Sequence, residues 1–324
     1  MDQLRISIII PHLNGKQHLH ACLSSLRAQT LQDFEVILVD NGSDDGSQAY
    51  VATNFPEVHL LQMDTNQGFT GACIAGWEVS HGEIVILLNN DTETDKNWLR
   101  EVSQAFAQQP QVGIVASKML LFDKRDHFHT AGDYYRLDGI PGNRGVWQKD
   151  RGQYDQPEFV FGACGGAAAY RRQMLDEIGF LDNDFFFSCE DVDLAFRANL
   201  AGWRVLYVPT AVVYHKLKAS GGGGEIGSYH DGRNFLYVIW KNYPTSMLRQ
   251  NWRLILRAQL KIGREAVQAW RGPAARARLR GQAAGLWGWF KMRSKRRQIQ
   301  AARRIDDEIL TAILTPVDDS PQHG

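Results

Sequence analysis

Three carboxylates stand close together in the sequence, Glu190, Asp191 and Asp193, directly after the aromatic run of residues 185–187. They fall in the first turn of a predicted helix, where acidic side chains commonly interact with the positive end of the helix dipole. A carboxylate in this place can also accept a proton from a hydroxyl, and the aromatic side chains would partly desolvate it and raise its pKa. We favour the second interpretation, in which the cluster contains a general base.

A further acidic position follows a continuous apolar run. Residues 84–88 are all Ile, Val or Leu, and Asn89-Asn-Asp-Thr92 comes directly after them. Hard divalent cations prefer oxygen ligands, so Asp91 is a candidate metal ligand. Asp91 or Thr92 could equally cap the helix expected around Trp98, and this segment alone leaves both hypotheses open.

An acidic, amide-rich turn, residues 39–47, follows another apolar run. Asp40 could accept the imide N–H of a uracil or thymine ring. Taken alone, the pattern is more typical of a helix cap supplied by Ser43 or Ser47, with Gly42 permitting a tight turn.

His215 ends another predicted strand. Neutral imidazole is a common metal ligand. A lone histidine is nevertheless more often a structural hydrogen-bonding group, so its role depends on its neighbours.

These residues must be positioned by the alternation of short apolar runs and helix-length segments in the first third of the chain. Strands separated by helices and buried on both faces predict βαβ units and a mostly parallel sheet. Such sheets bind ligands at the C-terminal ends of their strands, where the polar groups at Asn14 and at residues 40–43, 66–68 and 89–91 fall. The strands are expected at residues 6–11, 34–39, 58–63 and 83–88, and the helices at residues 19–29, 46–54 and 70–81.

Beyond residue 110 the alternation becomes irregular, and the glycine-rich residues 221–224 could form a mobile lid or a loose loop. We divide the chain into a catalytic domain of residues 1–244 with halves of about 1–110 and 111–244, a basic helical extension of residues 245–315, and a disordered tail of residues 316–324.

The composition is that of a globular protein. The chain has 324 residues, of which 44% are hydrophobic and 22% charged, and its formal net charge is zero. Its four cysteines have no metal-like or paired spacing, which favours free thiols in the cytoplasm. No stretch approaches the roughly 20 apolar residues of a membrane span, so any membrane contact is expected to be peripheral.

The C-terminal extension is strongly basic, and only Glu265 opposes its charge before Asp306. Apolar side chains, Trp and Phe among them, are interspersed, and a basic helix of this kind suits an anionic membrane surface. A helical cap on the catalytic domain and a nucleic-acid patch are the competing hypotheses; no recognition motif accompanies the charge, so we expect no nucleic-acid partner. The basic residues are Arg249, Arg253, Arg257, Lys261, Arg264, Arg271, Arg276, Arg278, Arg280, Lys291, Arg293, Lys295, Arg296 and Arg297.

Taken in order, these segments resemble those of family-2 glycosyltransferases with the nucleotide-diphospho-sugar transferase (GT-A type) fold, particularly the bacterial rhamnosyltransferase-like enzymes of surface polysaccharide synthesis. The similarity covers roughly residues 5–243, and the order and spacing of its motifs are more specific than any single one. The matching features are Ile-Ile-Ile-Pro11 with Asn14-Gly15, Val39-Asp-Asn-Gly-Ser43, Asn66-Gln-Gly-Phe69, Leu88-Asn-Asn-Asp91, Glu190-Asp191 with Gly202-Trp203, His215, and Arg233-Asn234 with Lys241-Asn242.

The resemblance implies inverting transfer of a sugar from a dTDP- or UDP-sugar to a hydroxyl of a lipid-linked glycan, at the inner face of the plasma membrane. Asp40 would bind the base, while Asp91 and His215 would hold Mg²⁺ or Mn²⁺ against the diphosphate. Asp191 would be the general base, and Glu190 would orient the acceptor or the loop. The other donor-binding residues implied are Pro11, Asn14, Asn41, Ser43, Asn66, Gly68 and Asn90.

Two positions depart from the family pattern. In many relatives the metal motif begins with Asp, whereas Asn89 and Asn90 precede Asp91 here. Relatives also often carry a pair of Asn residues where this chain has Cys73 and Ile74. The first departure predicts a modest, donor-dependent metal affinity, and the second leaves the donor sugar open.

Two alternatives are kept, a nucleotidyltransferase and a non-catalytic nucleotide-sugar-binding subunit. The first is disfavoured because no glycine-rich basic loop follows the first strand to hold a triphosphate. A hydride-transferring Rossmann enzyme is less favoured still, because the first strand is not followed by GxGxxG.

Overall fold

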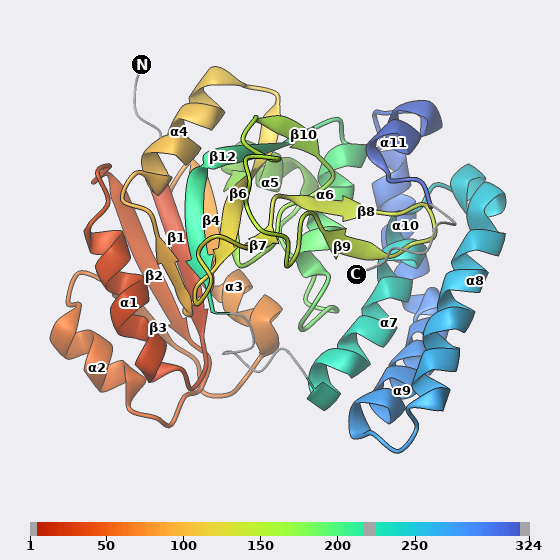
Figure 1. Cartoon of the computed structure of the whole chain (residues 1–324), viewed down its shortest axis with the longest axis horizontal. Coiled ribbons are helices and arrows are strands. Elements are labelled where there is room, and N and C mark those ends of the chain that lie inside the picture. The colour runs from red at the N-terminus through yellow and green to blue at the C-terminus, as the bar shows by residue number, and fades with distance from the viewer. Residues whose placement is uncertain (1–4, 217–223, 318–324) are drawn as a thin grey trace.

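The computed structural model describes residues 5–216 and 224–317, in which helices cover both faces of a central sheet (Figure 1). The strands are β1 (Ile6–His12), β2 (Phe34–Asp40), β3 (His59–Gln62), β4 (Ile84–Leu88), β5 (Thr92–Thr94), β6 (Val112–Leu121), β7 (Phe128–Thr130), β8 (Asp133–Tyr135), β9 (Pro141–Asn143), β10 (Glu158–Val160), β11 (Ala167–Arg171) and β12 (Arg204–His215). The helices are α1 (Lys16–Arg27), α2 (Ser47–Asn54), α3 (Gly68–Glu78), α4 (Trp98–Gln108), α5 (Arg172–Ile178), α6 (Glu190–Leu200), α7 (Gly224–Asn242), α8 (Thr245–Gln268), α9 (Pro273–Trp287), α10 (Trp289–Ala301) and α11 (Asp307–Ile313).

The central sheet has a parallel half and a mixed half. Its order is β10-β12-β6-β11-β4-β1-β2-β3. Strands β4, β1, β2 and β3 are parallel neighbours, as predicted for the first third of the chain. Strand β11 is antiparallel to both β4 and β6, while β12 is parallel to β6. The predicted α/β class with C-terminal helices is confirmed, and the antiparallel β11 makes the second half of the sheet mixed.

Two hydrophobic cores lie on opposite faces of this sheet. Successive side chains of a strand point to opposite faces. In β1, Ile8 and Ile10 therefore join the core that also contains residues of α1, α2 and α4. Ile9 points the other way, into the core with residues of α3, α5 and α6. Burial on both faces explains why residues 8–10 at the centre of β1 are all isoleucine.

The elements predicted in the first third of the chain are present with shifts of a few residues. The helix predicted at residues 19–29 is α1, and the one predicted at residues 70–81 is α3. The four cysteines are free, as predicted. Most of the glycine-rich segment for which a lid was considered, and residues 318–324 of the predicted tail, lie outside the described residues.

The C-terminal helices form the right-hand side of the molecule in Figure 1 and pack closely on α7. A Cβ added at Gly281 of α9 would lie 2.1 Å from the carbonyl oxygen of Tyr229 in α7, so the two backbones touch there. Gly285 likewise approaches Leu236 and the backbone of Arg233. The extension is thus docked on the last helix of the predicted catalytic domain. Within residues 5–216 and 224–317, no helix is both long and apolar enough to cross a membrane.

Candidate active site

The loops after β1 and β2 are joined by hydrogen bonds between the residues predicted to bind the nucleotide. The backbone N–H of Asn14 donates to Oγ of Ser43 at 2.9 Å, and Oδ1 of Asn14 accepts from the backbone N–H of Asp44 at 2.9 Å. Asn14 has a φ of 46°, in the left-handed region that Asn tolerates better than most residues. Parallel strands end at one edge of the sheet, which explains why residues about thirty positions apart meet here.

A second amide network joins the loops after β2 and β3. Nδ2 of Asn41 donates to Oδ1 of Asn66 and to the carbonyl oxygen of Gly68, both at 3.0 Å. Oδ1 of Asn41 accepts from the backbone N–H of Gln67 at 2.8 Å. Gly68 has a φ of 76°, and an added Cβ would lie 2.5 Å from the carbonyl oxygen of Phe186. Glycine is therefore required where this loop touches the segment that leads to Glu190.

Asp40 is completely buried beneath these loops. Its Oδ2 accepts from Nε2 of Gln48 at 2.6 Å, whereas its Oδ1 has no hydrogen-bond partner among the described residues. An unsatisfied buried acceptor fits an N–H donor such as a base imide. Because Asp40 is covered in this conformation, the side chain of Gln48, in the first turn of α2, would have to move to admit a base.

The other two predicted donor contacts are Pro11, in β1, and Asn90, two residues after the end of β4. Nδ2 of Asn90 is 2.7 Å from Nδ1 of His12, whose Nε2 is 2.8 Å from Oγ of Ser47. The pKa of His12 is lower than its ordinary value, chiefly because the side chain is buried. Pro11 is partly exposed and pairs in register with Val39 of β2. His12 and Ser47 thus tie Asn90 to the start of α2, a link that the sequence did not indicate.

Asp91 and His215, predicted as metal ligands, lie together. Strand β12 pairs with β5 so that His215 is opposite Thr92, next to Asp91. Nε2 of His215 lies 3.0 Å from Oδ1 of Asp91. Nδ1 of His215 faces Nδ1 of His129, in β7, at 3.1 Å, and burial with the neighbouring His215 lowers the pKa of His129 to about 3. His129 was not predicted from the sequence, because only the pairing of β7 and β12 with β6 brings it here.

This group has the chemistry of a cation site with few protein ligands. Asp91 is 1% exposed, and neither of its carboxylate oxygens accepts a hydrogen bond from a described residue. Two unsatisfied buried acceptors beside an imidazole nitrogen fit a divalent cation. No cluster of three or more His, Cys, Asp or Glu side chains suited to a metal occurs in the described part of the chain, so Asp91 and His215 could supply only part of a coordination shell.

Glu190 and Asp191 begin α6 after a constrained loop. Phe186, Ser188 and Cys189 all have φ between 61° and 69°, a conformation that costs energy for residues other than glycine. Asn234 of α7 stabilises this loop, because its Nδ2 lies within 3.0 Å of three carbonyl oxygens there. Arg233 donates to the carbonyl oxygen of Phe185 as well, and to that of Asp184. These donors fix the position of the α6 N-terminus.

The three acidic residues of α6 divide into two kinds. Burial raises the pKa of Asp191, although the N–H groups of Gly165 and Val192, at 2.8 and 2.7 Å, oppose this shift. Burial and the adjacent Asp191 raise the pKa of Glu190 well above its ordinary value. Asp193 differs: burial opposes its charge, but ion pairs with Lys241 and Arg197 lower its pKa overall. Asp193 is therefore a structural residue.

The two predicted reaction groups lie on either side of one short backbone segment. Gly165 donates its N–H to Asp191, and an added Cβ there would lie 3.4 Å from Oδ2 of that residue. The carbonyl oxygen of Gly166, the next residue, accepts from the N–H of Asn89 at 3.0 Å, two positions before Asp91. The fold thus brings the end of β4 and the start of α6 together across the turn before β11.

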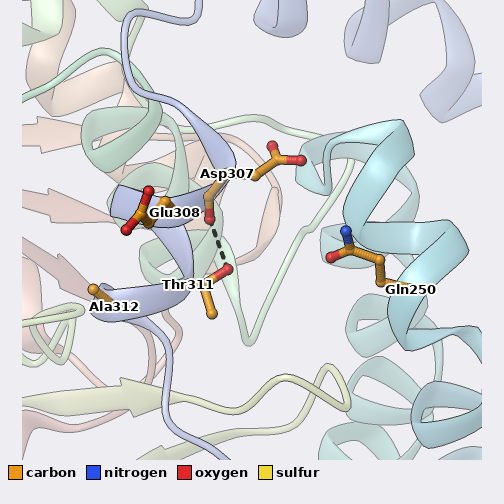
Figure 2. Close-up of a pocket in the computed structure, with 5 residues that line it drawn as sticks. All are labelled: Gln250, Asp307, Glu308, Thr311 and Ala312. Carbon is orange, nitrogen blue, oxygen red and sulfur yellow. Dashed lines mark hydrogen bonds between the residues drawn. The ribbon is translucent and has the colours of Figure 1, made fainter.

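A separate hollow of about 430 Å³ lies between α8 and α11, lined by Gln250, Asp307, Glu308, Thr311 and Ala312. Figure 2 shows that Gln250 projects from α8 toward α11, where Thr311 donates to the carbonyl oxygen of Asp307 at 2.6 Å. None of the predicted site residues lines this hollow, so it is distinct from the strand-end site.

Solved structures with this arrangement are sugar transferases of the GT-A type. GalNAc-T7 with UDP, GalNAc and Mn²⁺ has a TM-score of 0.60 and 17% identity, over 74% of this chain and 48% of that one. The mannosyltransferase PcManGT from Pyrobaculum calidifontis, in complex with GDP-Man and Mn²⁺, has a TM-score of 0.55 and 18% identity, over 93% of this chain and 86% of that one. The fold of the protein is therefore the predicted GT-A fold.

The family follows from the sequence. Residues 7–179 match the model of glycosyl transferase family 2, and the chain belongs to this family. O-antigen biosynthesis protein RfbC of Myxococcus xanthus is 32% identical over 231 residues, which are 67% of this chain and 18% of RfbC. N-acetylglucosaminyl-diphospho-decaprenol L-rhamnosyltransferase of Mycobacterium tuberculosis is 27% identical over 272 residues, which are 76% of this chain and 87% of that protein. The predicted likeness to rhamnosyltransferases of surface polysaccharide synthesis is confirmed.

Proposed function

We propose that the protein transfers a sugar from a dTDP- or UDP-sugar to a hydroxyl of a lipid-linked glycan, with inversion at the anomeric carbon, in the synthesis of a cell-surface polysaccharide. The observation that carries the proposal is the meeting of Asp91 with His215 on one side of the Gly165–Gly166 backbone and Asp191 on the other. The relatives support the substrate class, because one of them is named for transfer to a diphospho-decaprenol lipid and another for O-antigen biosynthesis.

The donor nucleotide would bind at the ends of the parallel strands. The unsatisfied Oδ1 of Asp40 would accept the imide N–H of uracil or thymine once Gln48 moves aside. Asn14, Asn41, Ser43 and the nearby Asn66 already hold one another through amide and hydroxyl contacts. Pro11, Gly68 and Asn90 would complete this surface, and the contact with His12 holds Asn90 in place.

Asp91 and His215 would hold Mg²⁺ or Mn²⁺ through a carboxylate oxygen and Nε2. When bound, the divalent cation stabilises the negative charge that develops on the departing nucleoside diphosphate. Two protein ligands are enough when phosphate oxygens and water complete the shell, as Mg²⁺ commonly requires. The proton of His215 must then be on Nδ1, and Nδ1 of His129 is placed to accept it.

Asp191 would be the general base. Its carboxylate takes the proton of the acceptor hydroxyl as that oxygen bonds to the anomeric carbon, and the bond from this carbon to the diphosphate oxygen breaks. The N–H groups of Gly165 and Val192 hold the charged form in place. Burial raises the pKa of the neighbouring Glu190 as well, and this residue would orient the acceptor or the loop.

The direct test is a screen of nucleoside diphosphates and nucleotide sugars by thermal shift, with and without Mn²⁺. The stabilising donors are then incubated with a synthetic polyprenyl-diphospho-sugar, and the anomeric configuration of the product is read by NMR. We expect metal-dependent stabilisation by a uridine or thymidine nucleotide and a product of inverted configuration. Pyrophosphate release from a nucleoside triphosphate, or a product of retained configuration, would refute the proposal.

A further inference from the structure

One face of α8 is apolar and faces solvent. Trp252, Leu256 and Leu260 are 52%, 48% and 62% exposed, and their spacing of four residues places them along one side of the helix. Val267, 58% exposed, continues the same side. The opposite side carries the buried Met247, Ile255 and Ala266, which attach α8 to the rest of the protein. The exposed apolar side is therefore not used to hold α8 in the fold.

Three further apolar side chains extend this face onto the neighbouring helices. Nε2 of Gln282 in α9 donates to the backbone and side-chain oxygens of Gln259 in α8, at 3.0 and 3.1 Å. Helices α8 and α9 are joined by a short turn and run in opposite directions, so the end of α9 lies level with the first half of α8. Leu286, Trp287 and Phe290 stand at this end, 60%, 76% and 72% exposed.

Cations accompany these apolar groups. Between residues 245 and 304 the chain has sixteen Lys and Arg and a single acidic residue, although the whole chain has no net charge. Several of the cations are exposed and form no ion pair with any described residue. These are Arg249, Arg253, Arg257, Lys261, Arg264, Arg271, Arg293 and Arg297.

The inner side of the extension forms ion pairs with the catalytic domain. Nζ of Lys295 in α10 lies 2.6 Å from Oδ1 of Asp182 and 2.7 Å from Oδ2 of Asp184, in the segment that leads to Asp191. Arg278 of α9 pairs at 3.0 Å with Asp231, which accepts a hydrogen bond from Ser188. The extension thus caps the domain with one side and leaves an apolar and basic side outward.

We propose that the outer face of α8–α10, defined by Trp252, Leu256, Leu260, Val267, Leu286, Trp287 and Phe290 with the surrounding cations, docks on an anionic lipid surface. Trp, Phe and Leu can enter the interfacial region of a bilayer, while Arg and Lys contact its anionic headgroups. A second copy of the chain is a poorer partner, because two such faces would bring like charges together. Nucleic acid would leave the apolar side chains uncovered.

Docking through this face would also orient the active site. The contacts of Lys295 and Arg278 link the extension to residues 182–188, directly before Glu190 and Asp191. An acceptor anchored in the same bilayer would then lie near the general base Asp191. This consequence rests on the proposed function, whereas the docking itself does not.

The test is co-sedimentation of the full chain with vesicles, without donor, metal or acceptor. Vesicles of phosphatidylcholine are compared with vesicles that contain about 30% phosphatidylglycerol. The test variant is Leu256→Glu/Leu260→Glu, whose parent side chains are exposed and whose substitution should leave the fold intact. The control is Gln104→Glu/Gln108→Glu on exposed positions of α4, which changes the net charge by the same amount.

We expect binding to the anionic vesicles that weakens with added salt. Each unfavourable charge near the surface should weaken binding by about fivefold, so the Leu double variant should bind about twenty-fivefold more weakly. The Gln control should bind like the wild-type protein. Equal binding of both variants, or equal binding to both kinds of vesicle, would overturn the proposal. The proposal would also be overturned if the protein formed a dimer in solution that the Leu double variant abolishes. The same holds if it bound duplex DNA more tightly than vesicles and the Leu double variant abolished that binding. Because no reaction is measured, failure of the proposed transfer would leave this result unaffected.

Discussion

The two sides of the candidate active site are held in different ways. On the nucleotide side, amides and hydroxyls such as those of Asn41 and Asn66 bond between neighbouring strand ends. On the base side, ion pairs add to the hydrogen bonds of Asn234, with Lys241 and Lys295 reaching the segment around Glu190 from later helices. A neutral hydrogen bond contributes about 1 kcal/mol, whereas removing one member of a buried ion pair costs several times more. The base side should therefore be the more sensitive one, in both chemistry and stability.

Asp191→Asn should have the largest effect. The variant keeps the shape of the side chain but cannot take the acceptor proton, and general-base catalysis is worth about 10²–10⁴-fold. We expect the rate of sugar transfer to fall by about a thousandfold. Nucleotide binding, measured by calorimetry, should remain within about twofold of wild type, because the nucleotide contacts lie on the other side. A near-normal transfer rate would remove Asp191 from the mechanism.

Lys241→Met should have the largest effect on stability. Nζ of Lys241 lies 2.6 Å from Asp182 and 2.8 Å from Asp193, and all three side chains are largely buried. Its loss leaves Arg197 as the one described cation paired with Asp193, beside a hydrogen bond from Asn242, at a cost of about 3 kcal/mol in the free energy of unfolding by urea. The counterpart on the nucleotide side is Asn41→Ala, for which we expect about 1 kcal/mol. Equal losses in the two variants would remove the distinction between the two sides.

The same difference explains which parts of the site could be read from the sequence. Asn14, Asp40, Asn66 and Asp91 each follow an apolar strand, and parallel strands end at one edge, so local pattern was enough to bring them together. The antiparallel β11 was missed, because its short alanine-rich sequence carries no signal of direction.

Long-range partners were not predictable. Asp193 was grouped with Glu190 and Asp191, since nothing in the local sequence shows that Lys241, 48 positions later, neutralises it. His129 reaches His215 across 86 positions through strand pairing alone. Only the fold supplies such contacts.

His129→Ala should have an intermediate effect that is confined to metal binding. The variant removes the acceptor for the Nδ1 proton of His215, and loss of such a supporting group typically weakens metal affinity by about 10–100-fold. We expect a loss in this range for Mn²⁺ titrated in the presence of UDP. The matched control is His127→Ala, a more exposed histidine two positions away that pairs with Asp126. Indistinguishable affinities of the two variants would exclude a supporting role for His129.

Asp133→Asn should have no effect on stability near pH 4 and an increasing effect as the pH rises. Burial and the nearby Asp191 raise the pKa of Asp133 to about 7. The pKa of Asp133 in the folded protein is thus higher than its ordinary value of 3.8. The protonated side chain therefore contributes its full stability below pH 3.8, and this contribution is lost as the pH rises to about 7. Oδ1 of Asp133 accepts from Thr130 and Asn143, which an Asn side chain can also provide. In urea, the variant should match the wild-type protein near pH 4 and be the more stable of the two above pH 7.

The control for this titration is Asp150→Asn, because it should give a difference of opposite sign. Burial acts on Asp150 as well, but its ion pair with Lys118 at 2.5 Å holds its pKa below the ordinary value. Its charge therefore stabilises the folded protein at neutral pH, so the Asn variant should be the less stable one there and should approach the wild-type protein as the pH falls. If Asp133→Asn also destabilised the protein at neutral pH, the charged form of Asp133 would not be unfavourable in the folded state. A buried carboxylate without an ion-pair partner would then be as stable near Asp191 as a paired one.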